Sequence, residues 1–390
     1  MFGKKGKEEN SIKKYAIYLL PFFLTCVGVI IRILCRNFVS LDYSGFLGPW
    51  YDIIKSLGGM SGIDIQVGNY SVLYQFIIGL FTYVPIPPLF LYKGLSCVFD
   101  LVLAAAGGLI AYKLTKKGWA GVVAYGILFL SPLVWMNSSL WAQCDAIYVS
   151  LILLALLCLF KEKYVRTFIF VGLAFAIKLQ TIFILPFLLF VWFAKRKFSI
   201  VYFGLVPLTM YLVNIPAFLL GRDVWSVFSV YIEQTGSYKQ MYANYPGFWA
   251  VFVDDASAPE VYGILSKVAI ALTVLALAMH MLYWFVRKVE LNRENLLCMA
   301  FVLTYTTVFF LPAMHERYGY LYEVLAIVIS VTTKRMIGGA IFLQVISLVT
   351  YSCYLFGTLY DVRLLAIFNC VIYVWYVIAF SKKVFIKGEK

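Results

Sequence analysis

Long apolar runs separated by short polar segments fill the chain from residue 14 to residue 380. A helix needs about 20 apolar residues to cross the hydrocarbon core of a bilayer, and many of these runs have about that length. The pattern predicts an all-α polytopic membrane protein with about twelve spanning helices. The expected helices cover residues 14–35, 89–113, 118–133, 146–160, a pair within 165–196, 198–220, 261–286, 295–311, 320–331, 336–356 and 364–380.

The apolar segment 165–196 is too long for one spanning helix and has basic residues at both ends. Short loops rich in Lys and Arg stay in the cytoplasm, so both ends are expected on the same side of the membrane. The one polar break in the segment is Lys178-Leu-Gln180-Thr181. We therefore expect two short helices that turn at Lys178, where irregular backbone must line a watered cavity within the protein.

The other basic clusters, among them the one at residues 382–387, fix the remaining topology. They predict a multi-pass membrane protein with both termini cytoplasmic. Residues 36–88 and 221–260 then form two long extracytoplasmic loops, and the first contains two short apolar segments, 46–57 and 70–84, expected as interfacial helices. Residues 1–390 are expected to form a single transmembrane domain without a soluble domain.

Composition agrees with a membrane protein, because 63% of the residues are apolar and only 13% are charged. The net charge of +14 lies mostly in the short clusters between apolar runs, which membrane anchoring explains without nucleic-acid binding. The eight cysteines lie mostly inside apolar runs and show no CxxC pair. They predict neither a disulfide framework nor a metal site.

Given this topology, the polar residues that interrupt apolar sequence fall on the extracytoplasmic side. Ionisable groups near a membrane are costly unless they face a polar cavity or one another, so a one-sided set indicates a functional site there. The candidates are Asp42, Asp52, Gln143, Asp145, Lys178, Gln180, His315, Glu316 and Arg317.

These candidates are of two chemical kinds. Lys178, His315 and Arg317 are donors suited to phosphate oxygens. Carboxylates such as Asp42 and Asp145 accept hydrogen bonds from a sugar hydroxyl or take its proton. This mixture suits transfer of a sugar from a lipid phosphate. A phosphate leaves readily once its charge is neutralised, so one carboxylate suffices, in contrast to the pair that glycoside hydrolysis needs.

Three sequence motifs carry a family resemblance. They are Ser139-Leu-Trp141-Ala-Gln143-Cys-Asp145, then Gly172-Leu-Ala-Phe-Ala-Ile-Lys178-Leu-Gln180 followed by Leu185-Pro186, and Leu311-Pro-Ala-Met-His315-Glu-Arg-Tyr318. In order and placement they resemble the bacterial GT-C glycosyltransferases, membrane enzymes of mannosyltransferase-like type that use polyprenyl-phosphate-linked sugars. The resemblance extends over nearly the whole chain.

The resemblance implies a GT-C fold, an active site on the outer face and inversion at the anomeric carbon of the sugar. It also implies that an acidic residue early in the first loop is the catalytic base, and Asp42 in Val39-Ser-Leu-Asp42-Tyr fits that position. Many relatives have two acidic residues there, whereas Asp42 has no acidic neighbour. No cofactor is expected, and a divalent metal stays an open alternative.

Structural roles are the alternatives for the acidic candidates. Asp42 and Asp145, the latter together with Gln143, could cap the helices that follow them, which is a common role of Asp. For Asp52 the solvated face of an interfacial helix is favoured, although Asp52 is retained as a candidate that orients substrate.

The basic candidates have alternatives as well. Lys178 could extend to the lipid headgroups. His315 and Arg317 could form a salt bridge with Glu316, which we expect to orient Arg317 rather than to react. Asp100 lies inside an expected spanning helix, and a structural pair with a nearby Lys is favoured over catalysis.

The interpretation is an inverting hexosyltransferase that moves a hexose from a polyprenyl-phosphate donor to a glycan or lipid acceptor outside the cell. A secondary transporter for an organic anion or sugar phosphate is the main alternative, but transporters place their polar site near the membrane midplane and often contain repeats. A ligase or polymerase of lipid-linked glycans is a further alternative.

Overall fold

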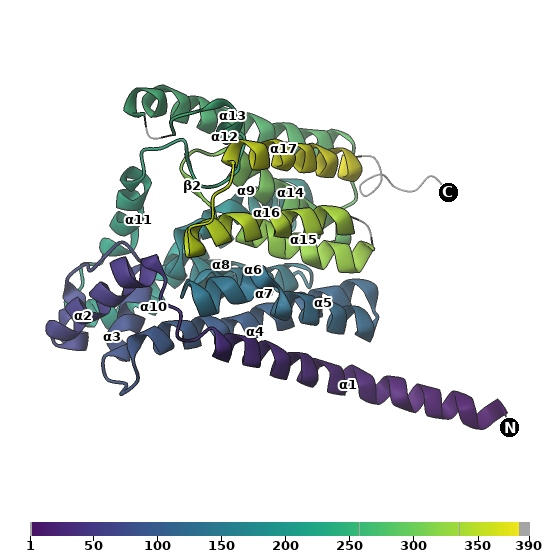
Figure 1. Ribbon diagram of the computed structural model, residues 1–390. Helices are drawn as coiled ribbons and strands as arrows, with labels where there is room; N and C mark the ends of the chain where they lie inside the picture. Colours follow the sequence, from purple (N-terminus) through teal and green to yellow (C-terminus); the bar gives the residue numbers. More distant parts are fainter. Residues whose placement is uncertain (1, 257, 335, 382–390) are drawn as a thin grey trace.

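The computed structural model describes residues 2–256, 258–334 and 336–381. Its helices follow the predicted order, with one helix for every apolar run and two for the segment 165–196 (Figure 1). These helices are α1 (Phe2–Leu34), α4 (Pro88–Thr115), α5 (Gly118–Leu130), α7 (Asp145–Leu159), α8 (Tyr164–Ile177), α9 (Leu185–Lys195), α10 (Leu205–Leu219), α13 (Pro259–Val286), α14 (Arg293–Phe310), α15 (Tyr320–Thr333), α16 (Ile337–Phe356) and α17 (Val362–Ala379). The basic cluster at 382–387 lies outside the described residues.

The protein is an all-α polytopic membrane protein. Within the described residues, six helices are long and apolar enough to cross a membrane, or seven if the bent pair 118–130 and 132–140 counts as one span. Five further apolar helices are shorter, at 10–17 residues, so length alone does not confirm a count of twelve. Several short helices are interior ones. Most side chains of α7 and α15 are buried, so protein rather than lipid surrounds them.

The predicted hairpin at Lys178 is confirmed by the contacts at its two ends. Helix α8 stops at Ile177, Lys178 has extended backbone, and the 3-10 helix η4 (Leu179–Ile184) leads into α9. Glu162, just before α8, forms ion pairs with Lys195 (3.6 Å) and Lys197 (2.9 Å) at the end of α9. The segment therefore returns to the side on which it began.

The first long loop folds into short helices, as predicted for its two apolar segments. They are the π-helix η1 (Tyr43–Leu47), α2 (Gly48–Ser56), the 3-10 helix η2 (Gly59–Asp64) and α3 (Val72–Phe81). Gly68 between them has φ +71°, and a Cβ there would lie 2.2 Å from the Trp50 ring. Only glycine allows the chain to pass so close to Trp50.

The second long loop contains α11 (Ser226–Ser237), the short strand β1 (Tyr242–Ala243) and α12 (Trp249–Phe252). β1 pairs in parallel with β2 (Met314–His315), with Ala243 opposite His315. The pairing fixes the segment that connects α14 to α15. Arg222 joins the two long loops, since its guanidinium donates to the Ile63 carbonyl (3.3 Å) and to the Gln66 side chain.

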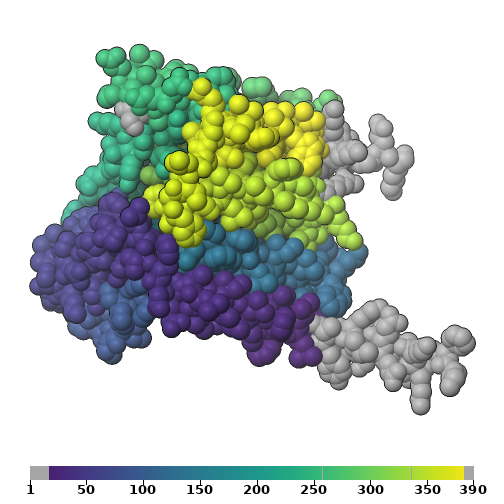
Figure 2. Space-filling model, in the orientation of Figure 1, coloured from purple at the N-terminus to yellow at the C-terminus, as the bar shows by residue number. Residues whose placement is uncertain are grey.

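Three short elements complete the chain, namely α6 (Pro132–Trp135), the π-helix η3 (Met136–Leu140) and the 3-10 helix η5 (Ile200–Gly204). The two long loops lie together at one end of the helices, and α1 begins and α17 ends at the other (Figure 1). In the space-filling view, the first loop and the last helices lie side by side on one face (Figure 2). Segments about 300 residues apart in sequence therefore meet where the loops gather, as the 312-residue separation of Asp42 and Tyr354 illustrates.

A buried ion pair inside the helices corrects one expectation. Asp100 on α4 pairs with Arg32 on α1 at 2.8 Å, and not with a lysine. Both side chains are at most 5% exposed. Burial of either charge alone would be very costly, so the pair fixes α1 against α4.

Candidate functional site

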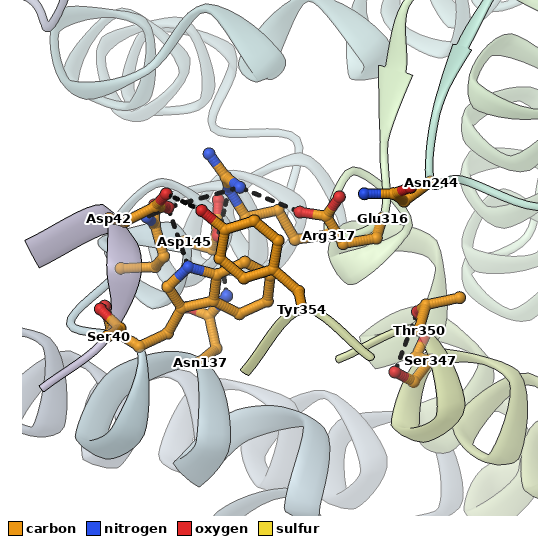
Figure 3. A network of polar contacts seen from close by, with 12 residues as sticks. Ser40, Asp42, Asn137, Asp145, Asn244, Glu316, Arg317, Ser347, Thr350 and Tyr354 are labelled. Atoms are coloured by element: carbon orange, nitrogen blue, oxygen red, sulfur yellow. Dashed lines mark hydrogen bonds and ion pairs between the residues drawn. The ribbon is translucent and has the colours of Figure 1, made fainter. Parts of the chain in front are cut away.

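Asp42 lies at the start of η1, just after the chain leaves α1. Its Oδ2 accepts hydrogen bonds from Trp141 Nε1 (2.8 Å) and Gln143 Nε2 (2.6 Å), and its Oδ1 accepts one from the Tyr354 hydroxyl (Figure 3). The carboxylate makes no capping bond to η1. The expectation that Asp42 caps the following helix is therefore wrong, and all three of its donors come from distant parts of the chain.

Two polar side chains fix the segment that presents Asp42. The Lys93 ammonium donates to the carbonyls of Cys35 (3.2 Å), Arg36 (3.0 Å) and Phe38 (2.6 Å), where α1 ends. A cation suits this position because the last carbonyls of a helix have no intrahelical partner. The Ser40 hydroxyl donates to the Trp141 carbonyl (2.9 Å) and so ties this segment to the motif that contains Gln143.

Asp145 and Lys178 form the second part of the site. Lys178 Nζ lies 2.5 Å from Asp145 Oδ1, and Asn137 donates to Asp145 Oδ2 at 2.8 Å. Cys144, not Asp145, occupies the N-cap of α7. The two oxygens of the Asp145 carboxylate contact Lys178 and Asn137 instead. Lys178 is only 8% exposed. The cap interpretation of Asp145 and the headgroup interpretation of Lys178 are therefore both wrong.

Arg317 lies between the two aspartates. Its NH1 is 3.7 Å from Asp42 Oδ2 and 3.1 Å from Glu316 Oε1, and its Nε is 4.0 Å from Asp145 Oδ2 (Figure 3). The guanidinium also lies over the Trp141 ring, 5.3 Å from its centroid. Its buried Nε has no hydrogen-bond partner among the described residues and faces the Asp145 carboxylate. Three carboxylates therefore lie within 4.0 Å of the guanidinium.

The electrostatics keep Arg317 charged. Burial alone would lower its pKa, but Asp42 and Glu316 oppose that, and the net result is a pKa well above the ordinary value. Burial raises the pKa of Glu316, and Arg317 partly offsets this. Glu316 is 2% exposed and contacts Arg317 directly, as expected of a residue that orients the arginine.

His315 is placed by β2 and by two aromatic rings. Its ring lies edge-on to Tyr238 (centroids 4.6 Å apart) and tilted against Tyr318 (5.1 Å). Burial, followed by the charges of Arg317 and Lys178, lowers the pKa of His315 to about 3. The imidazole is therefore neutral near pH 7 and can offer an N–H to an oxyanion without adding a third positive charge.

Six of the nine candidates line one cavity of about 530 Å³. Its polar wall is made by Asp42, Gln143, Lys178, Gln180, His315 and Arg317. Gln180 is 7% exposed, and its Oε1 has no hydrogen-bond partner in the part of the chain that the structure describes. The rest of the wall is largely apolar, with side chains from η4 and α13 such as Ile182 and Ile270. A cavity with a cationic end and an apolar wall suits an amphiphile with an anionic head.

Three of the nine candidates are not in the cavity wall. Asp145 and Glu316 lie directly behind it, where they contact Lys178 and Arg317. Asp52 is exposed on α2 and outside the cavity wall. The expectation that Asp52 orients substrate is therefore not supported, because its carboxylate faces solvent, as the alternative interpretation held.

Sequence reasoning missed several contributors to the site, above all Tyr354, Tyr70 and Asn137. Tyr70 donates to Gln143 Oε1 (3.0 Å), and Asn137 fixes Asp145. The chain has 29 tyrosines, and Tyr354 lies in an ordinary apolar helix, so no local pattern singles it out. Asn137 could have been found, since an amide flanked by apolar sequence in a membrane protein needs a polar partner.

Among residues 2–256, 258–334 and 336–381, no three or more His, Cys, Asp or Glu side chains gather closely enough to hold a metal ion.

The fold and this cavity together define a class, namely a polytopic membrane protein with a carboxylate and an arginine at the end of a half-apolar cavity. Comparison with known families shows to which family within this class the chain belongs. Residues 70–312, well over half of the chain, match the model of glycosyltransferase family 87. The chain belongs to this family, which consists of membrane glycosyltransferases of the GT-C type. A comparison with curated proteins gave no match.

The family match divides the site. Gln143, Asp145, Lys178 and Gln180 lie inside the matched residues 70–312. Asp42 precedes the match, and His315 and Arg317 follow it. Folding brings the segments that carry Asp42, His315 and Arg317 to the same cavity as the matched residues.

Proposed function

We propose that the protein is an inverting glycosyltransferase that takes a hexose from a polyprenyl-phosphate donor and gives it to a hydroxyl of a cell-surface glycan, a lipid-linked glycan or a glycolipid. The observation that carries this proposal is a single cavity in which the Asp42 carboxylate lies 3.7 Å from Arg317, with Lys178 in the same wall. Family membership supports transfer of a sugar.

The cationic residues would bind the donor phosphate. Lys178 and Arg317 provide two positive charges and neutral His315 provides an N–H, while the apolar wall would receive the first isoprene units. Arginine can engage two phosphate oxygens at once. These contacts matter most as the bond to the sugar breaks, because negative charge then grows on the phosphate.

Asp42 would act as the general base. The acceptor hydroxyl gives its proton to the carboxylate while its oxygen attacks the anomeric carbon. The bond from that carbon to the phosphate oxygen breaks, and polyprenyl phosphate leaves with the electron pair. Attack from the face opposite the phosphate inverts the anomeric carbon. Asp145 and Glu316 would hold Lys178 and Arg317 in place.

The active site is proposed to face away from the cytoplasm. Basic residues gather at the end of the helices opposite the two long loops, where Lys113, Lys161, Lys195 and Arg293 surround a second cavity. Short basic segments stay in the cytoplasm, which supports an extracytoplasmic position for the two loops and for the site between them.

Purified protein in lipid nanodiscs tests the proposal. It would be incubated with radiolabelled polyprenyl-phosphate hexoses and a bacterial lipid extract. We expect polyprenyl phosphate to be released in amounts equal to the labelled glycan product. A transporter would move label across vesicle membranes without release, and a polymerase would lengthen its product in steps. Absence of release with every donor would overturn the proposal.

Asp42→Asn is the decisive variant, with Asp52→Asn as its matched control. General-base catalysis contributes about 10²–10⁴-fold, so D42N should lose that much turnover while donor binding is retained. D52N makes the same chemical change on an exposed residue of the same loop and should leave turnover unchanged. Equal activity of D42N and D52N would remove Asp42 from the mechanism.

A further inference from the structure

The two oxygens of the Asp42 carboxylate have different surroundings. Oδ2 accepts from Trp141 and Gln143 and faces Arg317. Oδ1 has one hydrogen-bond donor among the described residues, the hydroxyl of Tyr354. Trp141 is fully buried and Gln143 is 1% exposed, and Tyr70 holds the Gln143 amide from its other end. The donors on Oδ2 are therefore fixed parts of the wall.

Tyr354, the donor to Oδ1, is more exposed than Trp141 and Gln143. It is half-buried, lines the cavity and lies in the last turn of α16. Its ring stacks on Trp141 with centroids 4.6 Å apart. Directly after it, Gly357 ends the helix with φ +68°, and the following residues are exposed, with Leu359 wholly so. The Tyr354 side chain is therefore less enclosed than those of Trp141 and Gln143.

We propose that the Tyr354 hydroxyl occupies the position of the acceptor hydroxyl on Asp42 Oδ1, and that the acceptor displaces it. This inference rests on the proposed function and deepens it, because it places the acceptor subsite on the α16 side of Asp42. The acceptor O–H then donates to Oδ1 and passes its proton there, while Oδ2 keeps its bonds to Trp141 and Gln143.

The arrangement has a chemical consequence. Water is a far smaller nucleophile than a sugar hydroxyl and has no further contacts with which to compete. While Tyr354 covers Oδ1, a water molecule cannot be deprotonated there, and a bound donor is protected from hydrolysis. An acceptor replaces the tyrosine because its other groups add binding energy. Tyr354 would thus favour transfer over hydrolysis.

Hydrolysis of the donor without acceptor tests this inference, with water as the only nucleophile. The donor would be the labelled polyprenyl-phosphate hexose that the wild-type protein uses, and the readout is free labelled hexose. A hydrogen bond of ordinary net strength corresponds to about a threefold to tenfold effect, so Tyr354→Phe should raise hydrolysis by that factor. The double variant with Asp42→Asn should abolish the increase.

Tyr376→Phe is the matched control. It removes a tyrosine hydroxyl that contacts the Met336 carbonyl and lies outside the cavity wall, so hydrolysis should stay at the wild-type rate. A tyrosine that only orients Asp42 would give the opposite sign, with hydrolysis and transfer both reduced in Y354F. Unchanged or reduced hydrolysis would overturn the inference alone. Failure of the wild type to use any donor would overturn the proposed function and the inference with it.

Discussion

The protein contains two buried arginine–aspartate clusters, and their difference separates structure from function. Arg32 pairs with Asp100 at 2.8 Å, donates to the carbonyls of Gly28 (3.0 Å) and Phe129 (3.1 Å), and lies over the Phe129 ring. Arg317 lies within 4.0 Å of three carboxylates, those of Asp42, Asp145 and Glu316. Arg32 lies outside the cavity wall, whereas Arg317 lines it.

This contrast indicates what each cluster is for. A buried charge is tolerated when its partners compensate for the lost hydration. The Arg32 cluster lies between helices and outside the cavity wall, so we expect it to stabilise the fold. Arg317 is surrounded by three carboxylates and lines the cavity. A charged group that a ligand can reach in a membrane protein is a functional candidate.

The largest expected effect is on stability, from Arg32→Met. It leaves Asp100 buried without its cation, and breaking such a pair costs about 3–5 kcal/mol of the free energy of unfolding. Thermal and denaturant unfolding in detergent would measure this loss. The double variant R32M with Asp100→Leu should recover most of it, because both charges are then gone. If R32M alone were as stable as the wild type, a structural role of Arg32 would be contradicted.

The next effect is on turnover, from Arg317→Lys. Lysine keeps the charge but cannot engage two phosphate oxygens, and loss of one donor to a developing oxyanion typically costs about 100-fold in kcat. The unfolding midpoint should stay near that of the wild type, since lysine keeps a positive charge beside Asp42, Asp145 and Glu316. A large loss of stability with kcat unchanged would make Arg317 a structural residue like Arg32.

Near neutral pH, the smallest effect concerns the protonation of His315. Burial, Arg317 and Lys178 lower the pKa of His315 to about 3 from the ordinary 6.5. Between these values the unfolded chain binds a proton that the folded protein does not, so the free energy of unfolding should fall as pH decreases from 6.5 toward 3. His315→Gln should remove this part of the slope. Unfolding measured across that range in both proteins would check it, and identical slopes would contradict it.

Much of the fold followed from the sequence. The positions of the basic clusters predicted that residues 165–196 turn back at Lys178, and the ion pairs of Glu162 with Lys195 and Lys197 confirm it. Polar residues on one side of the predicted topology also indicated that Asp42, Lys178 and Arg317 share a site, and all three line one cavity.

The errors of the sequence interpretation have a common cause. Asp52 was grouped with Asp42 because both lie in the first loop, but the orientation of α2 turns Asp52 to solvent. Asp100 was paired with a lysine, whereas the packing of α4 against α1 brings it to Arg32. Which polar groups face each other depends on helix rotation, and nearly uniform apolar sequence does not encode rotation clearly.

By itself, the sequence determined that the chain is a polytopic membrane protein and that polar residues gather in one site, because the cost of burying charge in lipid acts on each segment separately. Only the tertiary structure decided which polar side chains contact one another. Tyr354 reaches Asp42 across 312 residues, and Arg317 lies between Asp42 and Asp145. These contacts arise from the packing of α16 and the α14–α15 connection against the first loop, which no local stretch of sequence specifies.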